Sequence, residues 1–268
     1  MDLMNRMIRY LVTQGCADST IKTYTQILRM LLNQYPDFQD YGSEKLVYLL
    51  SEIADSIYRS SVRNVVLKVH RDMLGKVINI PFVKKPERLM GVYTHDEVRL
   101  IFSKIHNAKH LAIAKLLYVE GFRVGEVVSI LISDCNKMDS SIFIRGTKNK
   151  KDYKKYLDPS TLASLSEYCA WIKERRIKLK KYLFEGVDSN QYSMRSIQEF
   201  MRKAIQDAKL PVKGSCHVFR RSSSVWKIEN GWSAKHIAAS LNNTEKTVNK
   251  YYALVRPDYL KTLPKPVF

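Results

Sequence analysis

Four groups of residues in this chain have side chains that suit chemistry on phosphate groups. In chain order they are Arg123 with Glu126, the basic segment 145–155, His217 with Arg220, and the adjacent tyrosines Tyr251 and Tyr252. An arginine can bind two phosphate oxygens at once, and a tyrosine hydroxyl can act as a nucleophile. Taken singly, each group has a simpler explanation: an ion pair at helical spacing, a solubilising turn, a structural histidine, or tyrosines buried in a core. Their meaning therefore depends on the rest of the chain.

The charge of the chain predicts a polyanionic partner. Among its 268 residues, 45 are Lys or Arg and 26 are Asp or Glu, which gives a formal net charge of +19 and a pI of about 9.7. Such an excess favours nucleic acid as the partner first and an anionic membrane surface second. The hydrophobic fraction of 45% is ordinary for a globular protein and excludes wholesale disorder.

Membrane, secreted and metal-binding classes find no support in the sequence. The best apolar stretch, residues 111–119, is interrupted by Lys115 and is shorter than the roughly 20 residues that a spanning helix needs. The N-terminus carries charges where a signal peptide has its apolar core, so we expect a cytoplasmic protein. Neither a disulfide framework nor a zinc site is predicted, because no Cys-x-x-Cys pair or suitably spaced histidine accompanies Cys16, Cys135, Cys169 and Cys216.

The elements that must position these residues are predicted to be mainly helical. Residues 4–76 have helical periodicity, with one helix expected to begin at Ser19-Thr20 and two more over 44–56 and 60–76. Prolines and lysines in segment 80–87 are typical of a linker. We therefore predict a helical domain over residues 1–80, a linker over 81–90, and a second domain over 91–268 with a C-terminal tail from about 256.

The second domain is predicted to combine helices with one β-hairpin. Thr94 and Glu97 have the spacing of a capping box, and a helix over 108–120 is expected to end at Gly121. Residues 141–147 and 152–157 alternate apolar and polar side chains around a basic turn, which predicts a hairpin. Further helices are expected over 172–182, 193–208, 218–230 and 233–240.

The order of the motifs resembles the tyrosine recombinase, or phage integrase, family over essentially the whole chain. Segment 121–127 is similar to the family's Gly-Leu-Arg-x-x-Glu-Leu, and Lys148 sits in the hairpin turn where the family has a lysine. His217 and Arg220 match a His-x-x-Arg box, followed eleven residues later by Gly231. The resemblance implies a two-domain architecture, with a helical, SAM-like core-binding domain followed by a mixed α/β catalytic domain.

The end of the motif departs from the family pattern. Where the family has Leu-Gly-His, this chain has Leu241-Asn242-Asn243, so Asn243 takes the place of a histidine or tryptophan. An asparagine amide can donate a hydrogen bond to a phosphate but cannot carry a proton at neutral pH. The family's nucleophile lies nine residues after that histidine, which favours Tyr252 and leaves Tyr251 as the alternative.

The resemblance implies that Tyr252 attacks a DNA phosphodiester and forms a 3′-phosphotyrosine link, releasing a 5′-hydroxyl. Arg123 and Arg220 would stabilise the five-coordinate transition state, and Glu126 would orient Arg123. His217 would bind the phosphate or move the tyrosine proton, and Lys148 would protonate the leaving oxygen. Rejoining would need no ATP and no metal, so no cofactor is expected; the sequence has no phosphate-binding glycine loop or carboxylate cluster.

The expected partner is double-stranded DNA with short inverted-repeat core sites. Phosphate contacts are assigned to basic residues of both domains, namely Arg63, Lys68, Arg71, Lys150, Lys151, Arg195, Arg202 and Arg221. The family implies a homotetramer on DNA, joined through the C-terminal tail, and a monomer in free solution. Integration of a mobile or phage element, dimer resolution and DNA inversion would all use the same residues.

Two other functions remain open on the sequence alone. The first is a DNA-binding protein on the same scaffold that has lost catalysis, which only Asn243 supports. The second is a type IB topoisomerase-like enzyme that nicks and reseals one strand without exchanging partners. A membrane-surface role has the least support, because no strongly amphipathic helix with exposed large apolar residues is evident.

Overall fold

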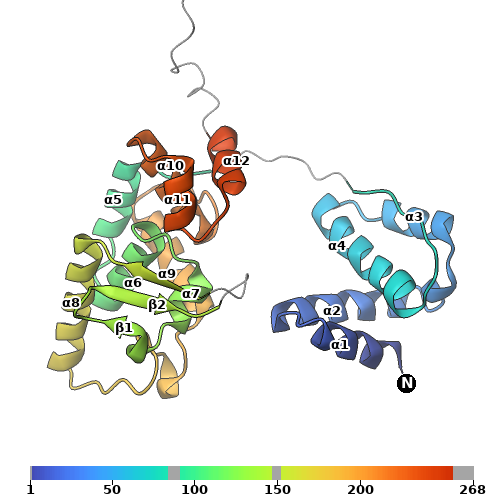
Figure 1. Cartoon of the computed structure of the whole chain (residues 1–268), viewed down its shortest axis with the longest axis horizontal. Coiled ribbons are helices and arrows are strands. Elements are labelled where there is room, and N and C mark those ends of the chain that lie inside the picture. The colour runs from blue at the N-terminus through green and yellow to red at the C-terminus, as the bar shows by residue number, and fades with distance from the viewer. Residues whose placement is uncertain (1, 84–90, 147–151, 256–268) are drawn as a thin grey trace, which may run out of the picture. The chain divides into compact units, whose positions relative to one another are not determined.

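The computed structural model describes residues 2–83, 91–146 and 152–255, and for 251–255 the backbone alone (Figure 1). The chain divides into two compact units, Met1–Glu87 and Arg88–Phe268, which we call the N-terminal and C-terminal units. The described residues are mostly helical, with one small antiparallel sheet in the C-terminal unit. The prediction of a mainly α protein with a small β element is confirmed.

The N-terminal unit is a group of helices around one core. Its helices are α1 (Leu3–Thr13), α2 (Asp18–Gln34), α3 (Ser43–Ser51) and α4 (Ser56–Leu67), with a 3₁₀ turn η1 (Phe38–Asp40) and a π-helical turn η2 (Lys68–Met73). Leu11, Leu28, Leu31 and Phe38 are fully buried in the core. The helical prediction for this part is confirmed, although α2 begins at Asp18 with Ala17 as its N-cap, not at a capping Ser19-Thr20 pair.

The C-terminal unit is built around two buried helices, α6 (Ala108–Tyr118) and α10 (His217–Glu229). Most of α6 from Ala112 onward is buried, and α10, which carries the buried Ser223 and Ser224, packs against it. The surrounding helices are α5 (His95–Ser103), α7 (Val124–Ser129), α8 (Pro159–Glu174), α9 (Met194–Asp207), α11 (Ala234–Ser240) and α12 (Glu245–Val255). The predicted capping box is present, since Thr94 and Glu97 each accept the other's backbone N–H.

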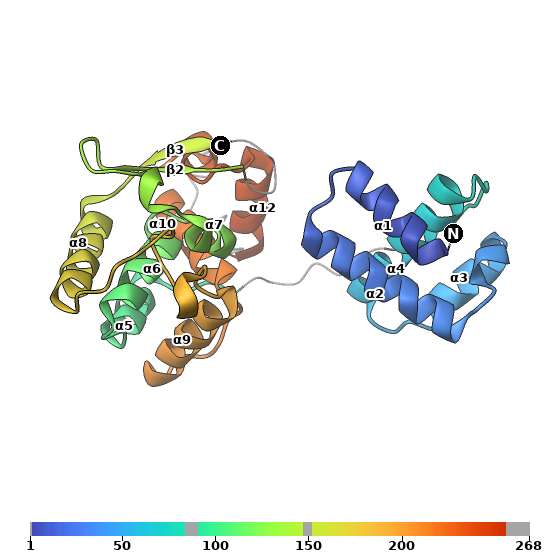
Figure 2. The same ribbon diagram turned by 90° about the horizontal axis from the view of Figure 1, so that it is seen from below.

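The sheet consists of β1 (Cys135–Asn136), β2 (Ser141–Ile144) and β3 (Tyr153–Tyr156) in that order, all antiparallel. Figure 2 shows β2 and β3 along one side of the helices. Ile142 and Ile144 of β2 are buried and pair with Lys155 and Tyr153 of β3. Paired residues share one face of a sheet, so the register turns Tyr153 and Lys155 inward, toward the helices.

One predicted helix is wrong in its extent. A helix over 172–182 was expected, but α8 ends at Glu174 and Arg176 adopts a left-handed φ of 54°. Beyond it, the Glu185 carboxylate accepts hydrogen bonds from the backbone N–H groups of Lys180 and Lys181, which a helix would use internally. The basic run after Glu174 also lacks the apolar stripe that holds a helix against a core.

In the regions of the chain that are described, none of the helices has the length and apolar character needed to cross a membrane.

Candidate active site

Arg123 and Glu126 lie at the start of α7 and are held together by two hydrogen bonds. Arg123 is the N-cap residue, and its backbone N–H donates to Glu126 Oε2 at 2.7 Å. Its guanidinium Nη1 donates to Glu126 Oε1, also at 2.7 Å. The Glu126 side chain is fully buried, whereas 23% of the Arg123 side chain is exposed. The carboxylate therefore fixes the arginine while part of the Arg123 side chain faces solvent.

Arg220 lies in the first turn of α10, close to the same carboxylate. Its Nη1 is 3.8 Å from Glu126 Oε2 and donates a short hydrogen bond to the Gly121 carbonyl oxygen. Gly121 has a φ of +69°, and a Cβ at that position would lie 2.3 Å from Leu241 Cδ2. A residue with a side chain would thus both strain the backbone and displace Leu241. Glycine at 121 lets the carbonyl reach Arg220.

The turn between α11 and α12 connects the two arginines. Asn242 and Asn243 donate backbone hydrogen bonds to the Ala239 and Ala238 carbonyls, and Asn242 adopts a φ of 45°, which is the pattern of a Schellman helix end. This turn points two successive carbonyls at the arginines. Arg220 Nη2 donates to Leu241 O, and Arg123 Nη2 donates to Asn242 O at 3.3 Å. Asparagine suits this position because it tolerates the left-handed region better than most residues.

His217 is the first residue of α10 and precedes Arg220 by nearly one helical turn. The residue as a whole is exposed, but its imidazole is partly desolvated, which lowers its pKa, and the positive charges of Arg220 and Arg123 lower it further. A pKa below the ordinary value of about 6.5 leaves the imidazole neutral at physiological pH. In that state it can accept a proton.

Tyr153 belongs to the same cluster and was not among the predicted site residues. It is half-buried on β3, close enough to the Glu126 carboxylate for that negative charge to act on its phenol. Burial, followed by the charge of Glu126, raises its pKa above the ordinary value. A raised pKa keeps this phenol protonated, so Tyr153 is poorly suited to be a nucleophile. Its place in the hairpin sequence gave no sign of this long-range contact.

Lys155 ties β3 to the end of α11. Its Nζ donates to the Ser240 carbonyl at 2.8 Å and to Ser240 Oγ at 3.0 Å, and it lies 3.8 Å from Glu120 Oε2. Burial lowers the pKa of this lysine, while Glu120 opposes that effect. Ser240 immediately precedes Leu241, so Lys155 holds the start of the turn that contacts both arginines.

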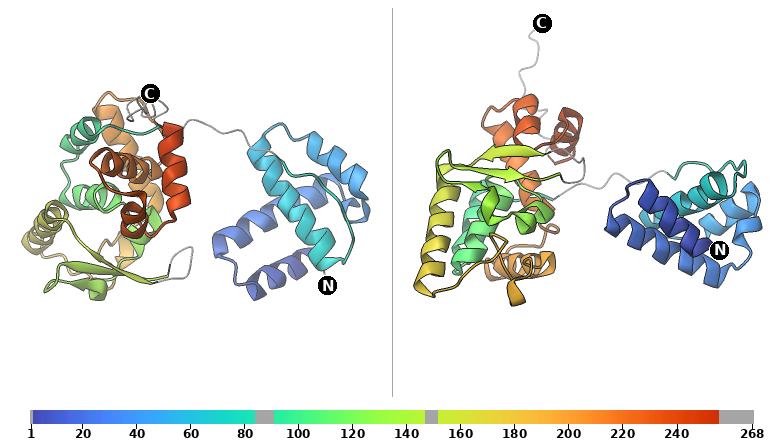
Figure 3. Two further views of the ribbon diagram at one scale, coloured as in Figure 1. Left: turned by 45° about the horizontal axis from the view of Figure 1, so that its top comes forward. Right: turned by 60° about the horizontal axis from the view of Figure 1, so that its bottom comes forward.

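Asn243 and the two tyrosines lie on either side of the start of α12. The Asn243 side-chain oxygen accepts a hydrogen bond from the Thr244 N–H at 2.9 Å. Tyr251 and Tyr252 are in α12, which packs against α10 and α11 (Figure 3, red). The structure places their backbone on the element that follows the turn. Three other predicted residues, Lys148, Lys150 and Lys151, lie outside the described residues.

The DNA-contact residues predicted in the N-terminal unit lie on α4 and η2, where two of them also make structural contacts. Arg63 donates to the Ile80 and Pro81 carbonyls at 2.8 and 2.7 Å, and Arg71 donates to Ile78 O at 2.8 Å. Lys68 lies 3.5 Å from Asp72. Arg63 and Arg71 therefore hold the backbone of residues 78–81 against α4 and η2.

The corresponding residues of the C-terminal unit lie on two helices. Arg195 and Arg202 are exposed on α9, and Arg195 forms an ion pair with Glu199 at 2.8 Å. Arg221 is half-buried on α10 and donates to Gly91 O at 3.3 Å. Its positive charge also lowers the pKa of His217, so it is closer to the arginine pair than the α9 residues are.

The arrangement is suited to binding an anion at one point. Two guanidinium groups meet over a single buried carboxylate, so the cluster keeps a net positive charge. Within the described parts of the chain, no three His, Cys, Asp or Glu side chains come together as a metal-binding group. Arginine forks of this kind match the oxygen geometry of a phosphate.

Comparison with known proteins defines the class. The model of the phage integrase family matches residues 92–257, which is more than half of the chain. The chain belongs to this family. It is a tyrosine recombinase, an enzyme that breaks and rejoins DNA in site-specific recombination.

Two relatives are distant in sequence but cover nearly the whole chain. Tyrosine recombinase XerA of Pyrococcus horikoshii is 24% identical over 269 residues, covering 97% of this chain and 91% of XerA. XerD of Oceanobacillus iheyensis is 22% identical over 277 residues, covering 94% and 93%.

Two solved structures show the same fold. XerH bound to palindromic difH substrate, in a post-cleavage complex, has a TM-score of 0.79 at 15% identity and covers 97% of this chain and 94% of its own. A lambda integrase tetramer bound to a Holliday junction has a TM-score of 0.74 at 17% identity, covering 93% and 76%.

Proposed function

We propose that this recombinase cleaves DNA by attack of Tyr252 on a phosphodiester, forming a 3′-phosphotyrosine link and a free 5′-hydroxyl. One observation carries the proposal. Arg123 and Arg220 share the Glu126 carboxylate and both bind carbonyls of the turn that leads into the tyrosine-bearing helix α12. A phosphate held by the two arginines would thus lie beside the start of that helix.

The arginines supply the electrostatic part of the reaction. In the transition state the phosphorus is five-coordinate and its nonbridging oxygens carry extra negative charge. Guanidinium groups already fixed by Glu126 stabilise that charge without having to reorganise. Arg123 has five N–H donors, and the hydrogen bonds described above from its guanidinium use two of them, so donors remain for phosphate oxygens.

Proton transfer is assigned to His217 and Lys148. As the tyrosine oxygen bonds to phosphorus, its proton passes to the neutral imidazole of His217. The bond between phosphorus and the 5′-oxygen breaks, and the Lys148 ammonium gives that oxygen a proton. The lowered pKa of His217 supports its role as acceptor. Asn243 donates a hydrogen bond to a nonbridging oxygen through its amide nitrogen. Rejoining reverses these steps and requires neither ATP nor metal.

The proposed substrate is duplex DNA with short inverted-repeat core sites, bound by four copies of the chain in the recombining complex. Two similar structures support this, since XerH was solved on a palindromic DNA and lambda integrase as a tetramer on a Holliday junction. The basic residues of both units would contact phosphates along the duplex, and the C-terminal tail would join neighbouring copies. The reaction would take place on cytoplasmic DNA.

Covalent capture tests the proposal. The protein is incubated with fragmented DNA from its source and denatured, and DNA attached to protein is recovered and sequenced at its ends. We expect adducts clustered at an inverted-repeat site, formed equally in EDTA and absent from Tyr252→Phe. Tyr251→Phe is the matched control and should still form them. Adducts that require a divalent metal would contradict the mechanism.

The same experiment separates the competing functions. Adducts scattered over unrelated sequences, with relaxation of supercoiled DNA that lacks any special site, would favour a topoisomerase-like enzyme. DNA binding without adducts from any variant would favour a scaffold that has lost catalysis. Retention of Arg123, His217 and Arg220 in one cluster argues against that outcome.

A further inference from the structure

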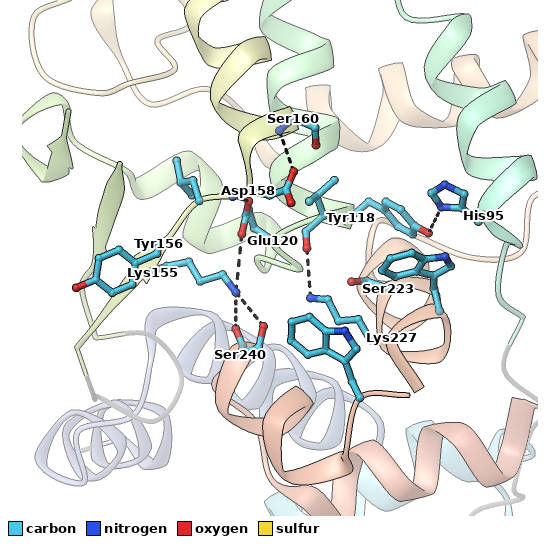
Figure 4. A pocket seen from close by; sticks show the side chains of 14 residues that line it. His95, Tyr118, Glu120, Lys155, Tyr156, Asp158, Ser160, Ser223, Lys227 and Ser240 are labelled. Carbon is cyan, nitrogen blue, oxygen red and sulfur yellow. Dashed lines mark hydrogen bonds and ion pairs between the residues drawn. The ribbon is translucent and has the colours of Figure 1, made fainter. Parts of the chain in front are cut away.

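A pocket of about 480 Å³ lies in the C-terminal unit, and neither Arg123 nor Arg220 lines it. It is bordered by the end of α6, by β3 and the residues after it, by α10, and by Trp232 and Ser240 (Figure 4). None of the residues assigned above to DNA cleavage lines it. Its volume is in the range of small-molecule sites.

Two lysines point into this pocket from opposite walls, and their partners differ (Figure 4). Lys155 is satisfied by Ser240 and by the nearby Glu120 carboxylate. Lys227 is only 6% exposed, and its Nζ donates one hydrogen bond, to Val119 O at 3.3 Å. Among the described residues, no carboxylate lies within 4 Å of Lys227.

The acidic residues of the pocket are committed elsewhere. Glu120 accepts the Asp158 N–H at 2.8 Å and faces Lys155, and the Asp158 carboxylate caps α8 by accepting the Ser160 N–H. Lys227 is thus buried without an ion pair to any residue that the structure describes, which is costly. Burial and the charge of Lys155 lower its pKa to about 8, so at neutral pH it still carries its proton.

Aromatic rings form the rest of the wall. Trp226 stacks on His95, with ring centroids 5.4 Å apart, and His95 hydrogen-bonds to the Tyr118 hydroxyl at 3.1 Å. The Lys227 ammonium is 5.5 Å from the centroid of Trp232, which is 44% exposed at the edge of the pocket. Aromatic walls suit a ligand with a flat ring, and the positive charge of Lys227 would be complemented by an anionic group on that ligand.

We propose that this pocket binds a small aromatic oxyanion, a carboxylate or phosphate ester on a flat ring, with the anionic group on Lys227 and the ring against Trp226 and Trp232. A small molecule fits better than duplex DNA, because Lys227 is only 6% exposed and a backbone phosphate of a duplex would have to enter the pocket to reach it. The ligand would supply the ion pair that Lys227 lacks among the described residues.

Tryptophan fluorescence of the full chain tests the site, because two of its three tryptophans line the pocket. The probes are benzoate, phenyl phosphate, benzamide as the uncharged match to benzoate, and inorganic phosphate without a ring. We expect benzoate or phenyl phosphate to change the fluorescence saturably. Benzamide and inorganic phosphate should each bind at least about tenfold more weakly, since each lacks one of the two contacts. Affinity should fall above pH 8, as Lys227 loses its proton.

Lys227→Met should lose the response to both anions, whereas Lys235→Met, an exposed lysine on α11, should keep it. Equal binding of benzoate and benzamide, or a full response in Lys227→Met, would overturn the proposal. So would a failure of every probe to bind wild type while Lys227→Met weakens binding to duplex DNA, which would make Lys227 a DNA contact. The comparison of probes on wild type remains decisive if the variant does not fold.

Discussion

At the scale of single residues, the site depends on arginines whose partners are already in place. Arg220 binds Glu126, the Gly121 carbonyl and the Leu241 carbonyl, so its guanidinium is fixed before any phosphate arrives. A lysine offers one point charge in place of a planar fork and cannot reproduce these contacts. The identity of the arginine therefore matters beyond its charge.

Arg220→Lys is predicted to slow DNA cleavage by at least about 100-fold, because the developing charge loses a fixed fork of donors. Single-turnover cleavage of a nicked site measures this. Binding of the same DNA should change little, since we propose that many other basic residues contact phosphates. Arg202→Lys, exposed on α9, is the control and should cleave normally. Normal cleavage by Arg220→Lys would remove Arg220 from the mechanism.

Lys227→Met is predicted to change how stability depends on pH. An unfolded lysine keeps its proton to about pH 10.4, while the folded-state pKa of Lys227 is about 8. Between these values the unfolded chain binds more protons, so wild-type stability rises with pH through this lysine. The variant lacks this effect. The unfolding free energy of Lys227→Met, taken relative to that of wild type, should therefore fall by something on the order of 3 kcal/mol between pH 7 and pH 10.

Urea unfolding of both proteins at pH 7 and pH 10 measures this difference, with Lys235→Met as the exposed control. A free-energy gap between Lys227→Met and wild type that stays constant with pH would show that Lys227 is not desolvated in the folded protein.

At the scale of elements, the sheet and the helices meet through one lysine. The register of β3 against β2 turns Lys155 inward, where it binds Ser240 at the end of α11. The next residue, Leu241, begins the turn that both arginines contact. Lys155 is therefore a positioning residue, acting on the site through the turn.

Lys155→Met should slow cleavage by about 100-fold while leaving DNA affinity within about twofold of wild type, because a displaced turn misplaces α12 without removing a phosphate contact. Lys155→Arg should restore part of the rate. Lys154→Met, on the solvent-facing side of the same strand, is the matched control. Equal rates for the Lys154 and Lys155 variants would refute the positioning role.

Features set by residues a few positions apart could be predicted from the sequence, whereas those set by distant residues could not. The hairpin and the capping box at Thr94 were predicted correctly, because both depend on residues a few positions apart. The end of α8 was not, since it is set by Glu185 and a left-handed Arg176 outside the helix. The bonds from Lys155 to Ser240 and from Arg123 to Asn242 join residues 85 and 119 positions apart. Helical and strand periodicity contain no information about such contacts.

The predicted site residues divide in the same way. Arg123, Glu126, Arg220 and His217 could be selected from motif spacing, and the structure brings them together. Tyr153 and Lys155 could not, because in the sequence they look like ordinary members of a basic hairpin. The inward direction of both follows only from the strand register.

At the scale of the whole molecule, charge dominates DNA binding. With a net charge of +19, the protein should release many counterions when it binds a duplex. If six or more phosphates are contacted, affinity should fall at least about 1,000-fold between 50 and 200 mM salt. Arg202→Ala should reduce the slope of this dependence by about one, whereas Arg99→Ala on α5, outside the predicted contacts, should not. A nearly flat salt dependence would contradict a phosphate-tracking surface.

The central claim is that Tyr252, brought to the phosphate by the turn that Arg123 and Arg220 hold, becomes covalently joined to DNA. The most direct measurement is mass spectrometry of the denatured, protease- and nuclease-digested adduct, in wild type and in the Tyr251→Phe control. We predict a nucleotide attached through a 3′-phosphate to Tyr252 in both proteins. Attachment to Tyr251, to Tyr153 or through a 5′-phosphate would contradict the account.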